Sequence, residues 1–240
     1  MKSTTQGNLQ IVSDGLIFYY DVANLNSFSL YKFVNGYRYE LKSLARIDDY
    51  ILPESGSSAI IDPGVVYSAN YSGGLTCNDS GYIQCPGFAD MSNSSYTIEF
   101  VIAPDRLNDT TPATENYIIK SDDADALIIK YGNDSSQIRF GNNGSTNVYT
   151  TNMQPDGSVY QFVLTYDSIG DDYVIYLGNT IETSGKRSGL WTTIHYPFKI
   201  GYNFDSFQLY QFRIYNKVLS TDEIQINREQ FRRRYGNNLA

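Results

Sequence analysis

The closing segment of the chain constrains its fold more than any other stretch. Residues 207–215 read Phe-Gln-Leu-Tyr-Gln-Phe-Arg-Ile-Tyr, an alternation that predicts a long strand with two usable faces. Asn216 and Lys217 then break the strand. Ser220 and Glu223 form the Ser-x-x-Glu pattern of a capping box, which predicts that a short helix begins here. This ending indicates a fold, but it does not by itself indicate a biochemical function.

Turn signals divide the rest of the chain into many short apolar segments. The 240 residues are 41% hydrophobic and 15% aromatic, with 22 Tyr, a composition typical of pleated sheets with one half-wet face. No helical periodicity precedes Ser220, so we expect one antiparallel sandwich or barrel. The predicted strands cover residues 16–20, 74–77, 82–85, 96–103, 117–120, 126–131, 137–140, 147–151, 159–167, 173–177, 192–196, 198–202 and 207–215.

Several of these segments resemble one family, the laminin-G-like and concanavalin-A-like jelly-roll domains. The resemblance is carried by residues 15–21, 96–104, 161–167, 173–179, 198–201 and 212–224. It covers residues 14–28 and 70–236, and it implies an all-β, antiparallel jelly-roll β-sandwich with one short C-terminal helix. The final helix, which runs into Arg234, Tyr235 and Gly236, is similar to the laminin-G-like proteins of tailed-phage structural genes.

The domain organisation follows from the resemblance and from the segments that depart from it. We expect a polar N-terminal arm at residues 1–14, a single laminin-G-like β-sandwich at 15–236, and a tail at 237–240. Residues 30–66 do not fit the family and look like an atypical insertion. Within that insertion, residues 33–41 are predicted to form a hairpin about Asn35 and Gly36, and residues 53–64 read as a loop.

No catalytic residues are predicted. Glucanases of the concanavalin-A-like class place Glu-x-Asp-x-Glu on one strand, so that alternate carboxylates line one groove. Here Glu99 stands alone in Tyr-Thr-Ile-Glu-Phe and is interpreted as an outward strand residue. A Gly-x-Ser-x-Gly elbow is absent, and the one histidine, His195, is interpreted as a strand residue rather than a general base. The sequence therefore favours a protein that is not an enzyme.

No cofactor and no metal site are predicted, although calcium stays an open alternative. Some relatives bind calcium through loop oxygens, and the chain supplies hard oxygen ligands at Asp122, Asp123, Asp125, Asp134, Asp171 and Asp172. The spacing of a dedicated site is missing, so these acids are interpreted as solvated loop residues.

The chain has only two cysteines. Cys77 and Cys85 flank a turn-like sequence and are placed where they can face each other across a hairpin. Because no export signal is visible, two reduced core thiols are predicted rather than a disulfide.

Charge excludes some partners. The net charge of −8 argues against binding a phosphate backbone, so no nucleic-acid partner is expected. No apolar run approaches a membrane span, and the polar start of the chain predicts synthesis and folding in a cytoplasm, with export by a route that leaves no recognisable signal as the alternative. Arg232, Arg233 and Arg234 are interpreted as cations at a helix C-terminus, with a docking patch for an acidic partner as the alternative.

These observations predict a non-enzymatic structural, decoration or adhesion subunit of a bacteriophage particle, on the capsid or the tail. Its partners would be other virion proteins and copies of itself, and its location the virion. The alternative is a carbohydrate-binding, lectin-like module for host-surface glycans, extracellular or at a cell surface, because tyrosine rings stack on sugars. A glycoside hydrolase is the remaining class, and it lacks the paired carboxylates.

Overall fold

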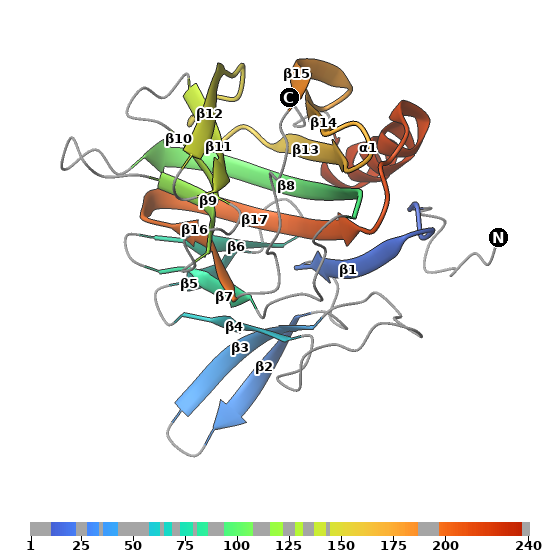
Figure 1. Ribbon diagram of the computed structural model, residues 1–240. Coiled ribbons are helices and arrows are strands. Elements are labelled where there is room, and N and C mark those ends of the chain that lie inside the picture. Colours follow the sequence, from blue (N-terminus) through green and yellow to red (C-terminus); the bar gives the residue numbers. More distant parts are fainter. Residues whose placement is uncertain are drawn as a thin grey trace.

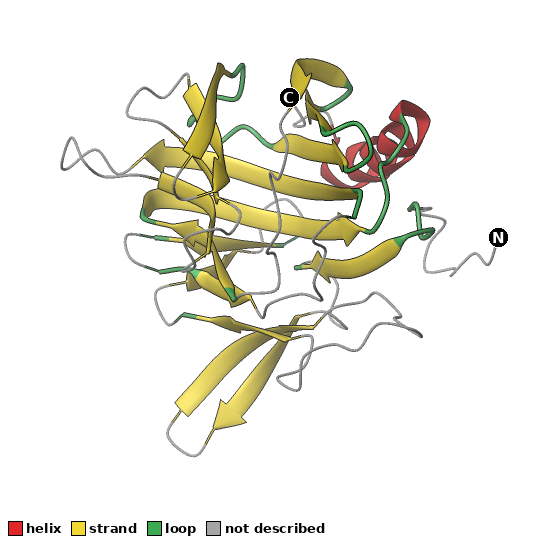
Figure 2. Cartoon of the chain, viewed as in Figure 1, coloured by secondary structure: helices red, strands yellow, loops and turns green. Residues whose placement is uncertain are grey.

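The computed structural model shows a β-sandwich with one helix against its outer side (Figure 1). It describes residues 11–22, 28–33, 36–42, 58–62, 65–68, 73–78, 81–85, 94–107, 116–121, 128–131, 137–142, 145–186 and 197–236. Figure 2 shows that strands make up most of this part of the chain and that its single helix lies near the C-terminal end. The predicted all-β class is confirmed.

The strands form two sheets, and every pairing within them is antiparallel. Sheet A has eight strands: β1 (Leu16–Asp21), β5 (Val65–Ser68), β6 (Gly74–Cys77), β8 (Tyr96–Leu107), β13 (Tyr160–Asp167), β14 (Asp172–Leu177), β15 (Thr180–Lys186) and β17 (Phe204–Tyr215). Their order is β15-β14-β13-β8-β17-β6-β5. Strands β6 and β1 pair with the same edge of β17, β6 at residues 207–209 and β1 at residues 211–215.

Sheet B has nine strands in the order β12-β11-β10-β9-β16-β7-β4-β3-β2. They are β2 (Phe28–Phe33), β3 (Gly36–Lys42), β4 (Ser58–Ile61), β7 (Ile83–Cys85), β9 (Asn116–Ser121), β10 (Ile128–Tyr131), β11 (Gln137–Asn142), β12 (Ser145–Thr150) and β16 (Phe198–Tyr202). The predicted hairpin about Asn35 and Gly36 is confirmed as the β2–β3 pair, although it begins earlier, at Phe28.

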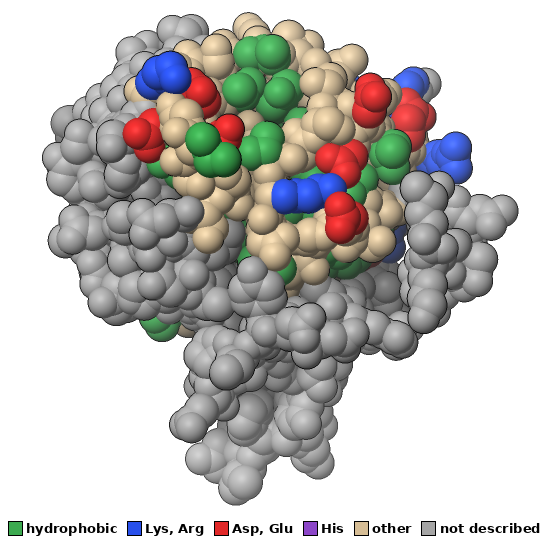
Figure 3. Space-filling view, turned by 45° about the vertical axis from the view of Figure 1, so that its right-hand side comes forward, with side chains coloured by type: hydrophobic (Ala, Val, Ile, Leu, Met, Phe, Trp, Pro, Cys, Tyr) green, Lys and Arg blue, Asp and Glu red, His purple; other side chains and the backbone are tan. Residues whose placement is uncertain are grey.

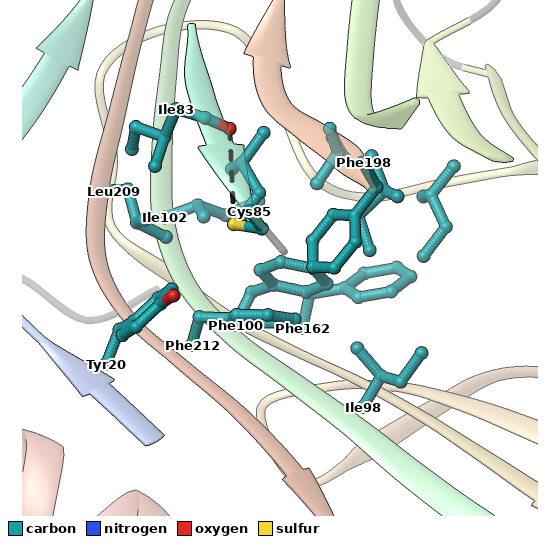
Figure 4. Close-up of a cluster of buried hydrophobic side chains, with 14 of the residues drawn as sticks. Tyr20, Ile83, Cys85, Ile98, Phe100, Ile102, Phe162, Phe198, Leu209 and Phe212 are labelled. Atoms are coloured by element: carbon teal, nitrogen blue, oxygen red, sulfur yellow. Dashed lines mark hydrogen bonds between the residues drawn. The ribbon is translucent and has the colours of Figure 1, made fainter. Parts of the chain in front are cut away.

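The core lies between the two sheets and is rich in aromatic rings (Figure 4). Phe100 and Phe212 of sheet A stack with centroids 4.7 Å apart. Phe198 of sheet B packs edge-on against Phe212 at 5.8 Å, and this contact joins the sheets. Burying large rings on both inner faces supplies the main apolar driving force for the sandwich.

Cys77 and Cys85 lie in this core as free thiols, as predicted. They do not face each other across a hairpin, because β6 belongs to sheet A and β7 to sheet B. The hairpin interpretation was wrong: the turn-like residues between them connect the two sheets. Burial raises the pKa of both thiols above the usual range.

The closing strand β17 departs from the simple alternation that its sequence predicts. Phe207 and Leu209 face the core, and so do Phe212 and Ile214. The register shift against β8 between Leu209 and Gln211 makes this change of phase. Strict alternation from Phe207 would place Phe212 and Ile214 on the outer face, so the alternation rule does not reveal this bulge.

The helix α1 (Thr221–Tyr235) covers the outer face of sheet A. The predicted capping box is present: the Ser220 hydroxyl accepts from the Glu223 backbone N–H, and the Glu223 carboxylate accepts from the Ser220 backbone N–H at 2.9 Å. Ile224 and Phe231 pack down on apolar residues of the sheet. Val12, within the predicted N-terminal arm, is buried against the same helix and donates from its backbone N–H to the Asn227 side chain at 3.0 Å.

The structure contains strands that the sequence does not predict. Strand β4 lies inside the segment interpreted as a loop, and β15 was not predicted because its sequence, Thr-Ile-Glu-Thr-Ser-Gly-Lys, is polar and largely exposed. The strand predicted at residues 192–196, which includes His195, lies outside the described residues.

Candidate functional site

The outer face of sheet B carries a set of tyrosine and lysine side chains on four adjacent strands. Ile83, Ile119 and Ile200 point into the core and are at most 2% exposed. Their strand neighbours Gln84, Lys120 and Lys199 therefore point outward and are partly exposed. The backbone register places Lys199 directly between Gln84 on β7 and Lys120 on β9.

Tyr202 joins this outer set because Gly201 interrupts the alternation of β16. Strict alternation from Ile200 would turn Tyr202 into the core. Gly201 has a φ of 72°, and a Cβ there would lie 2.8 Å from both the Cys77 Sγ and a Phe207 ring carbon. A glycine in the left-handed region therefore lets β16 approach the core closely and turns the next side chain outward.

A bulge in β9 turns the Tyr117 side chain to the outer face in a similar way. Both Ile118 and Ile119 face the core, and the register between β9 and β10 shifts at this point. Tyr117 then pairs with Lys130 of β10 on the outer face, where each is 9% exposed. The end of the outer set on β10 is thus buried, and Tyr82, Gln84, Lys199 and Tyr202 at the other end are half-buried.

The rings and the ammonium groups of this set alternate in space. Tyr202 lies in the middle, with Tyr82 at 5.6 Å and Tyr117 at 6.0 Å between ring centroids. Lys120 Nζ is 4.5 Å from the Tyr202 centroid, and Lys199 Nζ is 5.3 Å from it. We call this surface the Tyr–Lys face; its residues are Tyr82, Gln84, Tyr117, Lys120, Lys130, Lys199 and Tyr202.

The chemistry available to the Tyr–Lys face is binding. Tyrosine rings present apolar faces with hydroxyl handles, lysines present donors with positive charge, and the Gln84 amide presents both a donor and an acceptor. The Gln84 amide donates to the Phe198 backbone carbonyl at 3.3 Å, which holds it against β16. Strands β7, β9, β10 and β16 contain no Asp or Glu, so no carboxylate from them stands on this face as an acid or base.

A second polar cluster lies beneath α1, on the outer face of sheet A. Arg213 and Glu99 are 0% and 1% exposed and form an ion pair at 3.2 Å. The Glu99 oxygen of this pair, Oε2, also accepts a hydrogen bond from the Asn227 side chain of α1 at 2.8 Å. The other oxygen, Oε1, accepts from the Gln161 side chain at 2.6 Å. Burial by itself would lower the pKa of Arg213, but the electrostatic interactions with Tyr19 and Glu99 raise it above the usual range.

This cluster fixes the helix on the sheet rather than exposing a reactive group. Arg213 donates to Gln230 of α1, and its guanidinium lies between the rings of Tyr19 and Phe231 at 4.6 and 4.7 Å. The interpretation of Glu99 as an outward residue is correct for the direction of its side chain, but α1 covers it. A carboxylate with no solvent access and three donors is unsuited to general acid or base chemistry.

The three arginines in the last turn of α1 have different surroundings. Arg234 forms two hydrogen bonds with Asp21 of β1, at 2.7 and 2.8 Å, and Arg232 pairs with Glu229 at 3.1 Å. Arg233 is exposed. Figure 3 shows this side of the molecule with Lys and Arg side chains lying next to Asp and Glu. The three arginines sit in the last turn of the helix, as the macrodipole interpretation predicts.

The acids considered as calcium ligands are not brought together where the structure describes them. Asp171 accepts from the Tyr166 hydroxyl at 2.8 Å, and Asp172 pairs with Lys186 at 3.1 Å. Asp122, Asp123, Asp125 and Asp134 lie outside the described residues. No group of three or more His, Cys, Asp or Glu that could hold a metal ion occurs in the part of the chain that the structure describes. Likewise, no helix of that part is long and apolar enough to cross a membrane.

Sequence reasoning missed the Tyr–Lys face entirely. Its residues come from three parts of the chain, residues 82–84, 117–130 and 199–202, and only the sheet order brings these parts together. One signal was available: the segments 117–120 and 198–202 each combine a lysine with a tyrosine and carry no acid. The positions of Tyr117 and Tyr202 depend on a bulge and on Gly201, which the alternation rule does not foresee.

Two facing antiparallel sheets with a helix against one outer side define an antiparallel jelly-roll β-sandwich of the lectin-like class. Residues 77–225 match the pattern of the family described as the concanavalin A-like lectin/glucanases superfamily, and the chain belongs to this family. The match begins at Cys77, after the segment predicted to be an insertion. A search of curated protein sequences found no match.

Solved structures with this fold include several bacterial toxin domains. The binding domain of Paraclostridial Mosquitocidal Protein 1 superposes with a TM-score of 0.68 at 16% identity, covering 91% of this chain and 53% of that one. The binding domain of botulinum neurotoxin serotype D gives 0.63 at 13% identity, covering 90% and 52%. A botulinum neurotoxin type C structure gives 0.65 at 13% identity, covering 92% and 52%. This chain thus spans about half of each toxin structure, and the likeness shows the fold alone.

Proposed function

We propose that this chain is a non-catalytic carbohydrate-binding module that takes saccharides on its Tyr–Lys face. The observation that carries the proposal is the row of three tyrosine rings on one sheet face, interleaved with lysine donors at 4.5–5.6 Å. Sugar rings present an apolar C–H face and a rim of hydroxyls. Ring stacking and hydrogen bonding from the same surface suit both.

Three further observations support this reading. The family is lectin-like, and α1 packs on sheet A, so the helix does not cover the Tyr–Lys face of sheet B. Cell entry of botulinum neurotoxin type C depends on its interaction with two ganglioside molecules, which is a property of that toxin. Glu99, a lone strand carboxylate, is buried in an ion pair. The proposal implies an extracellular or surface-exposed place of action, where glycans are found.

The virion structural role has no support from these comparisons and stays a prediction, together with the self-association and virion partners attached to it. A glycan-binding surface and a place on a particle are compatible. Detection of the protein in purified particles by mass spectrometry tests that role independently of sugar binding.

A glycan array followed by titration calorimetry tests the proposed function. The wild-type chain is expected to bind a defined set of glycans, and Tyr202→Ala is expected to weaken that binding by about 1–2 kcal/mol, roughly 5- to 30-fold, because the central stacking ring is lost. Tyr67→Ala is the matched control, since Tyr67 is a 39% exposed tyrosine on β5 of the other sheet. Melting curves establish that both variants fold. The proposal fails if the wild type binds no glycan, or if the Tyr202 variant binds as the wild type does.

A further inference from the structure

The side-chain amide of Gln84 is held in one orientation on the Tyr–Lys face. Ile83 and Cys85, its neighbours on β7, are turned into the core, so the Gln84 side chain stands on the outer face. Its Nε2 atom donates to the Phe198 backbone carbonyl at 3.3 Å and to the Cys85 backbone carbonyl at 3.5 Å. Because a carbonyl can only accept a hydrogen bond, the NH₂ group has to face these two oxygens, and Oε1 points away from them.

The Oε1 atom of Gln84 is an open acceptor. The side chain is half-buried, and its Oε1 accepts no hydrogen bond from any residue that the structure describes. This oxygen is not sealed from solvent, in contrast to Oε1 of Gln161, which is unpaired in the layer beneath α1, where the side chain is 0% exposed. A group from outside the protein can therefore reach Gln84 and donate to it.

The other residues of the Tyr–Lys face cannot take this role. Lysine ammonium groups only donate, and a tyrosine hydroxyl rotates about its C–O bond, so it imposes no single direction on a partner. Strands β7, β9, β10 and β16 contain no Asp or Glu that would add a carboxylate acceptor. Among the residues of this face, Gln84 thus provides the one side-chain acceptor with a fixed direction.

Gln84 lies beside the rings on which a sugar is proposed to stack. Tyr82 precedes it by two positions on the same face, a spacing of about 7 Å along an extended chain. The Tyr82 and Tyr202 ring centroids are 5.6 Å apart. Lys199, the register partner of Gln84, has its Nζ 5.1 Å from the first of these centroids and 5.3 Å from the second. A sugar ring on either tyrosine therefore has its rim of hydroxyls next to Gln84.

We infer that Gln84 is the specificity-determining residue of the Tyr–Lys face, and that its Oε1 accepts a hydrogen bond from one hydroxyl of the bound saccharide. This inference rests on the proposed carbohydrate-binding function and states how the site distinguishes one saccharide from another. Ring stacking tolerates many sugars, since it needs only an apolar C–H face. An acceptor held in one direction rejects an analogue that lacks the hydroxyl, because the acceptor then stays unpaired.

A glycan array tests the inference with sugars that differ at a single hydroxyl. The array carries disaccharides of glucose, galactose, mannose and N-acetylglucosamine, each with its monodeoxyfluoro analogues, and calorimetric titration follows for the pairs that bind. Fluorine keeps a polar substituent at the same carbon but cannot donate a hydrogen bond. The wild-type chain is expected to bind a hydroxyl sugar about three- to tenfold more tightly than the analogue fluorinated at one particular position.

Substitutions of Gln84 locate the acceptor. Gln84→Met keeps a similar length without the amide, so this variant is expected to bind the hydroxyl sugar and the fluorinated analogue with equal affinity. Gln208→Met is the matched control, because Gln208 is a half-buried glutamine on β17 of sheet A whose Oε1 accepts from the Tyr210 hydroxyl. Gln84→Leu provides a second variant if the methionine impairs folding. The readout is the affinity ratio within each variant, which a merely loosened sheet leaves unchanged.

The outcomes separate the two proposals. A preference for the hydroxyl that is lost in the Gln84 variants and kept in Gln208→Met supports the inference. Binding without such a preference at any position overturns it and leaves the carbohydrate-binding function standing. A preference that survives both Gln84 variants, or that Gln208→Met loses as well, also overturns it, since the hydroxyl would then be recognised elsewhere. Absence of wild-type binding to every sugar on the array removes the proposed function together with the inference.

Discussion

At the scale of single residues, Gly201 determines what the outer surface of sheet B presents. Its φ of 72° lies in the region that favours glycine, and its position between Ile200 and Tyr202 turns the tyrosine outward. A side chain at this position meets the Cys77 sulfur and the Phe207 ring at 2.8 Å, so the requirement for glycine comes from conformation and packing together.

Gly201→Ala is expected to destabilise the protein by at least about 2 kcal/mol, because backbone strain and overpacking each cost about 1–3 kcal/mol. Gly157→Ala is the control: Gly157 also has a positive φ, 80°, but a Cβ there would meet only the Asp105 carboxylate, at 3.3 Å. Urea unfolding of both variants measures the difference. Equal losses would mean that conformation alone requires the glycine and that the contact with the core is unimportant.

The buried ion pair beneath α1 gives a second prediction at this scale. Arg213→Met leaves the Glu99 carboxylate buried without its cation, which is expected to cost about 3–5 kcal/mol. Adding Glu99→Gln removes the orphaned charge, so the double variant should be more stable than Arg213→Met alone. A double-mutant cycle by chemical denaturation measures the coupling. Losses that simply add would show that the two charges do not depend on each other.

At the scale of elements, the start of α1 depends on a small charged cluster. Lys217 donates to Glu223 at 2.6 Å and to Asp14 at 2.7 Å. Partial burial would raise the pKa of Glu223, but the hydrogen bond from Lys217 and the one from the Ser220 backbone lower it. Partial burial would lower the pKa of Lys217, but its hydrogen bonds to Asp14 and Glu223 raise it. Both shifts favour the charged pair that joins β17's end to the helix.

The pH dependence of this cluster follows from the direction of the shift. Since the pKa of Glu223 is lower in the folded state, its contribution is complete above the unfolded value of about 4.3 and is lost as the pH falls through the folded value. Glu223→Gln is therefore expected to cost about 0.5–1 kcal/mol at pH 7 and to cost less as the pH drops below about 4. Asp14→Asn, at an 86% exposed partner of the same lysine, is the control. Urea unfolding at a series of pH values measures the free-energy cost of Glu223→Gln. A cost that stays constant with pH contradicts the lowered pKa of Glu223 in the folded state.

The same elements show what the sequence can and cannot predict. The capping box at Ser220 is read correctly because all its contacts lie within four residues. The strand before it is located correctly, but its bulge at Tyr210 is not, because apolar residues occupy both faces and tertiary contacts with β8 decide which ones point inward. Strand β15 was missed because an exposed, polar strand lacks the hydrophobic signal on which strand prediction relies.

At the scale of the whole molecule, the sheet order decides which residues form a surface. Tyr117 and Tyr202 belong to β9 and β16, and Tyr82 directly precedes β7. These three strands are neighbours in space, although more than thirty residues separate each tyrosine from the next in the chain. No local pattern brings them together. The fold class was therefore predictable from the sequence, whereas the Tyr–Lys face required the topology.

The two thiols provide a measure of how the whole sandwich opens. Cys77 and Cys85 are both 0% exposed, lie on opposite sheets and belong to one continuous core. A reagent can reach either sulfur only when the core opens, globally or locally. Burial also raises the pKa of both thiols, so little thiolate is present in the folded state. We expect a disulfide-exchange reagent to modify both cysteines at the same slow rate under native conditions, and to do so faster in urea as global unfolding increases.

Peptide mass spectrometry of the labelled protein follows each cysteine separately. Equal rates with the same urea dependence as the loss of the folded state would mean that the two sheets form one cooperative unit, because neither sulfur is reached before the other. Faster labelling of Cys77 would instead locate a local opening at the edge formed by β5 and β6, and faster labelling of Cys85 an opening between β7 and its neighbours β4 and β16. The second case bears on binding, since Tyr82 directly precedes β7 and β16 carries Lys199 and Tyr202. A saccharide held across these strands would slow the labelling of Cys85 in proportion to its occupancy.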